Sequence, residues 1–150
     1  MCSVLTTAKT TRLEVVKTGQ IGSFGSLIFE VTHEKVRTFD ELTRSATARW
    51  SKHERFGQKP RSEFLGPDLD SISFKMRFDA QYGVNPKSEM DKLLDLCRSG
   101  KADTLIIGGT PIGRDQWVIT SVKQSWTAVD NQGRVIVGTA DVTMEEYMRK

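Results

Sequence analysis

The sequence predicts a mainly β protein of the α+β class, an antiparallel β-sandwich or open barrel with one flanking amphipathic helix. Residues 69–79 alternate apolar and polar side chains, which is the period of a strand with one buried face. Residues 86–99 instead repeat apolar side chains at helical spacing. Residues 130–133 (DNQG) form a hairpin-turn signal between two long β-rich segments. Successive strands joined by short turns favour antiparallel sheets, so the single helix is expected to cover a face or an end of them.

The N-terminal third is expected to combine an arm with short strands. Residues 1–19 are rich in threonine, and we expect a flexible arm there, with a short strand at residues 13–16, ahead of a single domain over residues 20–150. Residues 26–32 (SLIFEVT) have a strand composition. A second strand is predicted at residues 43–54, and the turn-forming residues 57–60 end it.

The remaining elements follow from the same patterns. Short strands are expected at residues 61–65 and 104–107, long strands at 117–126 and 134–147, and a tight glycine-rich loop at 108–113. The helix has marked ends, because Asn85 suits the N-cap, Pro86 the first helical position and Gly100 the left-handed residue after the last turn. The expected core is Ile72, Phe74, Met76, Phe78, Met90, Leu93, Leu94, Trp117, Ile119 and Val122.

Composition narrows the function classes. The 150 residues include 37% hydrophobic and 27% charged residues, an ordinary composition for a globular protein. No apolar run approaches the ~20 residues that span a bilayer, and no signal-peptide pattern is present, so no membrane partner is expected. Two cysteines, Cys2 and Cys97, do not make a disulfide framework and indicate a reducing compartment.

The usual catalytic and cofactor motifs are missing, so we expect a protein without enzymatic activity, cofactor or metal. His33 and His53 lack the further ligands of a zinc site. Cys97 lies on the apolar side of the predicted helix, where a buried thiol is expected rather than a nucleophile. Residues 68–71 lack the glycine and glutamate of a calcium loop, and residues 108–115 lack the Lys and hydroxyl of a phosphate loop.

One segment mixes aromatic, basic and proline residues and is the candidate interface. Trp and Arg are typical anchors of protein interfaces, whereas the net charge of +3 is small for a nucleic-acid binder. A protein partner is therefore preferred, and a surface that stacks single-stranded nucleic acid is the alternative. The predicted interface residues, on a loop from 53 to 65 and the strand before it, are Trp50, Lys52, His53, Arg55, Phe56, Lys59, Arg61 and Phe64.

The same segment resembles a known family. Residues 50–73 (WSKHERFGQKPRSEFLGPDLDSIS) contain a tryptophan, a His-Glu-Arg core, a Lys-Pro pair, an aromatic residue ahead of Gly-Pro and a strand that opens Leu-Asp-Ser-Ile. The helix at 90–98, the glycine turn at 108–113, the strand at 117–122 (WVITSV) and the last hairpin follow in order. Over residues 21–148 the chain resembles the tail protein U family (GpU) of contractile-tailed bacteriophages and phage-tail-like bacteriocins.

The resemblance implies a tail-tube-like fold and a structural role in a contractile phage tail or tailocin. It implies assembly at the baseplate, near the junction of the inner tube and the central hub, with a tail terminator that caps the tube as the alternative. The implied partners are the inner tube, the central hub, a LysM-type baseplate protein, and sheath or wedge subunits. The implied state is a ring homo-oligomer, trimeric or hexameric, within a virion or tailocin particle assembled in the bacterial cytoplasm.

Overall fold

The computed structural model describes residues 20–31, 36–37 and 39–149. The predicted N-terminal arm, the strand at 13–16 and His33 lie outside these residues. The elements run in the order β1 (Gln20–Phe24), β2 (Leu27–Val31), β3 (Val36–Arg37), β4 (Phe39–Ser45), β5 (Ala48–Arg55), β6 (Gln58–Pro67), β7 (Ser71–Asp79), the 3₁₀ helix η1 (Ala80–Tyr82), α2 (Pro86–Ser99), β8 (Leu105–Ile107), β9 (Thr110–Pro111), β10 (Gln116–Val129) and β11 (Val135–Tyr147). The prediction of a mainly β protein with one helix is confirmed.

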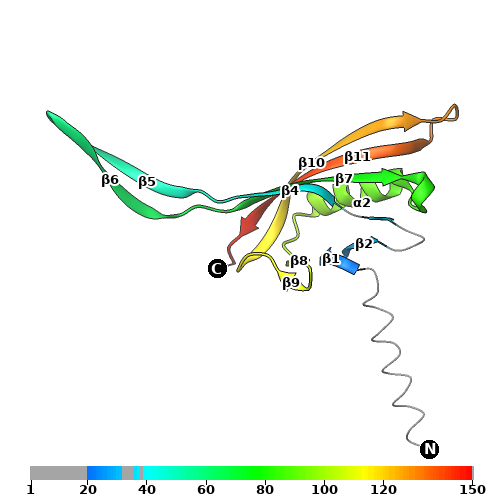
Figure 1. The fold of residues 1–150 in the computed structure, drawn as a ribbon, viewed down its shortest axis with the longest axis horizontal. Helices are drawn as coiled ribbons and strands as arrows, with labels where there is room; N and C mark the ends of the chain where they lie inside the picture. Colours follow the sequence, from blue (N-terminus) through cyan, green and yellow to red (C-terminus); the bar gives the residue numbers. More distant parts are fainter. Residues whose placement is uncertain (1–19, 32–35, 38, 150) are drawn as a thin grey trace, which may run out of the picture.

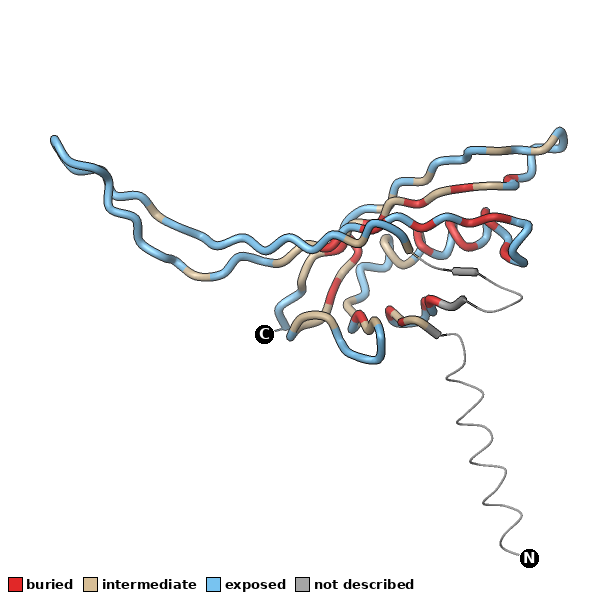
Figure 2. The backbone as a smooth tube through the Cα atoms, in the orientation of Figure 1, coloured by how far each residue is buried: buried red, intermediate tan, exposed pale blue. Residues whose placement is uncertain are grey.

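The strands form three antiparallel sheets (Figure 1). One sheet has the order β10-β11-β7-β4, a second the order β3-β2-β1-β8-β9, and β5 pairs only with β6. None of the three sheets closes into a barrel among the described residues, so the sandwich alternative of the sequence prediction applies. Helix α2 and the five-stranded sheet lie on the same side of the four-stranded sheet (Figure 1). The core lies between these layers, as Figure 2 shows.

The alternating pattern of β7 builds the centre of this core. Every second side chain of β7 is buried, and β7 pairs with β11 in a register that places Met76 opposite Ala140 and Phe74 opposite Val142. Phe29 of the five-stranded sheet contacts Phe74 edge to face, with ring centroids 5.9 Å apart, which joins the two layers. The predicted core side chains are buried except Leu94 and Val122, which are half-buried.

Helix α2 has the bounds that its sequence signals predict. Asn85 accepts a hydrogen bond from the Ser88 backbone N–H, and Gly100 adopts a left-handed φ of 61°. The helix packs Met90 and Leu93, both fully buried, against the four-stranded sheet. Gly138 of β11 permits this approach, because a Cβ there would lie 2.8 Å from the Met90 Cε.

Three sequence predictions are corrected. The strand predicted at 43–54 is two strands, β4 and β5, because the chain leaves the four-stranded sheet at Ala46-Thr47. The predicted interface loop at 53–65 is a β-hairpin, and its second strand, β6, is longer than the predicted 61–65. The loop at 108–113 contains the short strand β9, which pairs with β8. Strand β1 escaped prediction, since two glycines in and next to it obscure any alternation.

Candidate functional site

The β5–β6 hairpin, called the arm below, projects away from the rest of the molecule (Figure 1). Its ten-residue strand β6 is about 33 Å long at the ordinary rise of a strand. Every residue of both strands is exposed except Ser51 and Gly66, which are half-buried (Figure 2). The arm thus adds nothing to the described core and presents both faces to its surroundings.

Local chemistry explains why this segment forms a hairpin. Phe56 and Gly57 make a two-residue connection between Arg55 and Gln58, and Gly57 adopts a φ of 67° that glycine tolerates without steric cost. The rings of Trp50 and Phe64, which lie opposite one another, meet edge to face with centroids 5.2 Å apart. Such a cross-strand aromatic pair stabilises a hairpin by about 1 kcal/mol at most.

The eight residues predicted as an interface all lie on the arm and are all exposed. The structure brings Trp50 and Phe64 together, and it places His53 opposite Arg61. Phe56 stands at the tip with its side chain fully exposed. The predicted set was Trp50, Lys52, His53 and Arg55 on β5, Phe56 in the turn, and Lys59, Arg61 and Phe64 on β6.

Sequence reasoning missed two arm residues that share this surface. Glu63 Oε2 lies 3.1 Å from His53 Nε2, an exposed contact that contributes little to stability. Leu65 is 60% exposed beside Phe64 and extends the apolar part of the arm. Leu65 is an apolar residue directly before Gly66-Pro67 and belongs to no alternating pattern, and this could have marked it as an exposed interface residue.

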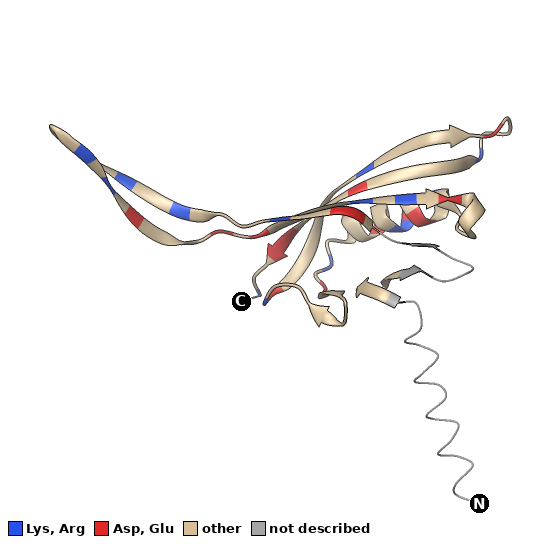
Figure 3. Cartoon of the chain, in the orientation of Figure 1, with Lys and Arg blue, Asp and Glu red and all other residues tan. Residues whose placement is uncertain are grey.

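The arm is positively charged. It has five Lys/Arg and two Asp/Glu, a formal net charge of +3, which equals that of the whole chain. The basic residues are spread along both strands, as Figure 3 shows. Because they stand on an exposed hairpin with aromatic neighbours, the arm fits a partner with carboxylates around an apolar patch.

The root of the arm is held by charged residues near the end of β4 and just before β7. Arg44 of β4 pairs with Asp70, and its guanidinium lies 5.9 Å from the centroid of the Trp117 ring. The Asp70 backbone also bonds to β11, because its carbonyl accepts a hydrogen bond from the Glu146 N–H at 2.9 Å. Asp68 N–H donates to the Thr47 carbonyl at 2.8 Å, which closes the root.

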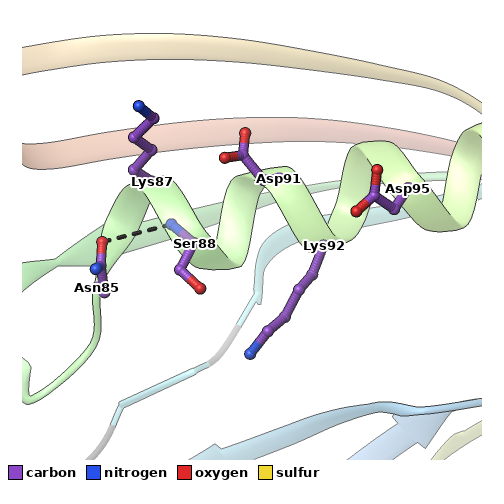
Figure 4. Close-up of a pocket in the computed structure, with 6 residues that line it drawn as sticks. All are labelled: Asn85, Lys87, Ser88, Asp91, Lys92 and Asp95. Carbon is purple, nitrogen blue, oxygen red and sulfur yellow. Dashed lines mark hydrogen bonds between the residues drawn. The ribbon is translucent and has the colours of Figure 1, made fainter.

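The outer face of α2 is a second polar surface. Lys87, Asp91, Lys92 and Asp95 line a shallow depression of about 390 Å³. Figure 4 shows how these side chains lie on the helix. The side chains point in different directions rather than toward one point, and Lys92 bonds to Glu89 of its own helix. This arrangement is that of a solvated helix face.

The described residues contain neither a cluster of metal ligands nor a membrane-spanning helix. Among the described residues, no three or more His, Cys, Asp or Glu side chains are grouped so that they could hold a metal ion. No helix in the described part of the chain is long and apolar enough to cross a membrane.

Comparisons with known proteins identify the family. No curated protein matches the chain in sequence. Among solved structures, the chain is similar to one from the tail of an empty GTA particle with C6 symmetry, at 16% identity and a TM-score of 0.44, over 87% of this chain and 92% of that one. The family described as Phage P2 GpU matches residues 25–148, most of the sequence. The chain therefore belongs to the Phage P2 GpU family and is a structural component of a phage tail.

Proposed function

We propose that this tail protein assembles as a ring at the baseplate end of the tail, near the junction of the inner tube and the central hub, and that the arm makes its contact with an adjoining subunit. The exposed arm is the observation that carries the proposal. An isolated two-stranded hairpin is at best marginally stable in water, and this one lacks a core of its own. A hairpin with exposed Trp50, Phe56 and Phe64 gains most when a partner covers those rings.

The geometry of the arm favours a protein partner over single-stranded nucleic acid. Bases stack on aromatic faces that lie open along a strand. Trp50 and Phe64 instead meet each other at an interplanar angle of 62°, so they do not form a flat platform. A gel shift with single-stranded DNA at physiological salt would support the nucleic-acid alternative, and we expect none.

Replacing Arg55 and Phe56 together by alanine tests the arm. We expect Arg55→Ala/Phe56→Ala to leave the subunit folded, with an unchanged circular dichroism spectrum and Tm, because neither side chain is buried. We expect it to abolish particle assembly, because both side chains are then missing from the contact. The matched control is Lys123→Ala/Ile136→Ala, which removes an exposed base and an exposed apolar residue from β10 and β11. Normal-length particles from the arm variant would refute the proposal.

The position in the tail is tested separately. Loss of a component that starts the tube prevents tube assembly, whereas loss of a cap that stops the tube affects its length. We expect deletion of the gene to leave no assembled tubes, whereas loss of a terminator would leave tubes of uncontrolled length. An electron micrograph of particles with a tagged subunit should show the tag at the baseplate end, and a tag at the other end would identify a terminator.

A further inference from the structure

A groove with a volume of about 720 Å³ lies at the root of the arm. The name root groove is used for it here. Leu69 and Met148 line it and are 42% and 61% exposed, so they form an apolar patch that nothing in the described chain covers. The charged residues of the groove are four carboxylates and three arginines, so its carboxylates outnumber its basic side chains by one: Asp68, Asp70, Asp115, Glu146, Arg44, Arg49 and Arg114. Arg44 is already paired with Asp70. Exposed apolar side chains with carboxylates beside them suit the basic and aromatic side chains of the arm.

The charges of the arm and the rest of the described chain are complementary. The arm has a formal net charge of +3. The other described residues (20–31, 36–37, 39–47 and 68–149) contain twelve Lys/Arg and fifteen Asp/Glu, a net charge of −3. The arm of one copy is therefore complementary in charge to the described part of another copy's body.

The tip of the arm carries an aromatic ring with basic side chains beside it. Phe56 is a fully exposed ring at the tip, and Arg55 and Lys59 flank it. Since the strands of the arm are about 30 Å long and extended, the tip stands far from the root groove of its own copy. The tip can therefore enter a root groove only on another copy.

We propose that the tip of one copy's arm binds in the root groove of the next copy, with Phe56 against Leu69 and Met148 and with Arg55 and Lys59 near Asp68 and Asp115. This inference rests on the proposed function, in which the arm is the contact surface, and it names the partner as a second copy. Tip and groove are different surfaces, so the contact is head-to-tail and each copy both gives and receives one. Such contacts close into a ring when the rotation between copies allows it.

A photo-crosslinker at the tip tests this contact in assembled particles. The full-length protein would carry Phe56→p-benzoylphenylalanine, and the control would carry the same residue at Ile136, which is exposed on β11. After irradiation, we expect covalent dimers of the subunit from the first protein, with the crosslink mapped by mass spectrometry to Leu69, Met148 or their neighbours. We expect the control to give no crosslink to the root groove.

The outcomes separate this inference from the proposed function. A crosslink to a different tail protein, or to another surface of the same subunit, would overturn the tip-to-groove contact and leave the arm as the interface. Normal particles with no crosslink from position 56 would overturn both. If the modified subunit fails to assemble, charge reversal takes the place of the crosslinker.

The charge reversal is a rescue experiment. Arg55→Glu/Lys59→Glu should lower the yield of particles at least about tenfold, because like charges then face each other in the contact. Adding Asp68→Lys/Asp115→Lys on the same chain restores opposite charges and should restore most of that yield. A quadruple variant that is folded, by its circular dichroism spectrum, but assembles no better than the double variant would contradict the pairing.

Discussion

Removing the arm should leave the body of the protein as stable as before, or more stable. Thr47 and Asp68 are already joined by a backbone hydrogen bond of 2.8 Å at the root, so a two-residue Asn-Gly turn can replace residues 48–67. The deletion removes exposed side chains and no member of the core. The only large contribution to the change in the free energy of unfolding then comes from the lower entropy cost of closing a shorter connection.

The size of the change in the free energy of unfolding follows from the number of residues removed. Shortening a flexible connection from twenty residues to two lowers the closure cost by (3/2)RT ln 10, about 2 kcal/mol. If the arm is an ordered hairpin in the free subunit, its ends are already held together and the gain falls toward zero. We therefore expect a change between about 0 and 2 kcal/mol in favour of the folded state, or up to about 4–8 °C in Tm.

Urea unfolding followed by circular dichroism measures this change, and the slope of the transition reports the surface exposed on unfolding. The slope should stay close to that of the full chain, because the arm is exposed in both states. A deletion variant less stable by more than about 1 kcal/mol would show that the arm supports the body, and the reasoning about its exposure would be wrong. The same variant should fail to form particles.

Two further predictions concern the body. Gly138→Ala places a Cβ 2.8 Å from the buried Met90 Cε, so Met90 must move within a full core, and we expect a loss of about 1–3 kcal/mol in urea unfolding; an unchanged midpoint would mean that α2 shifts freely. The Asp130 carboxylate accepts hydrogen bonds from the backbone N–H groups of Arg134 and Gln132, and these lower its pKa. Its contribution to stability is therefore present above the unfolded pKa and is lost as pH falls through the lower folded pKa. Carboxyl NMR titration of the folded chain should give a lower midpoint for Asp130 than titration in urea, and equal midpoints would contradict this.

The elements that sequence patterns predicted are those with local signals. The ends of α2 follow from Asn85, Pro86 and Gly100, which satisfy or omit backbone groups within one turn. The sequence of β7 alternates apolar and polar residues because one face of the strand meets the core and the other meets solvent. Both patterns lie within about fourteen consecutive residues, so they can be recognised without knowledge of the surrounding fold.

The arm lacks such a signal, and its form could not be predicted for that reason. Both of its faces are exposed, so apolar and polar side chains do not alternate along β5 or β6. The residue types still marked it as an interface candidate, since Trp, Phe and Arg stand close together in a turn-rich segment. The root escaped prediction because Arg44 and Asp70, which pair there, are separated by the whole arm.

The attachment of the arm has a mechanical consequence. The two chain segments at the root continue into β4 and β7, which are hydrogen-bonded neighbours in the four-stranded sheet. A pull along the arm therefore loads both strands together, and β7 passes the tension to β11 through a ladder of nine residue pairs. Shearing such a ladder requires its hydrogen bonds to break together, whereas peeling an edge breaks them singly. The arm is thus attached to strands that must be sheared, rather than peeled, before they separate.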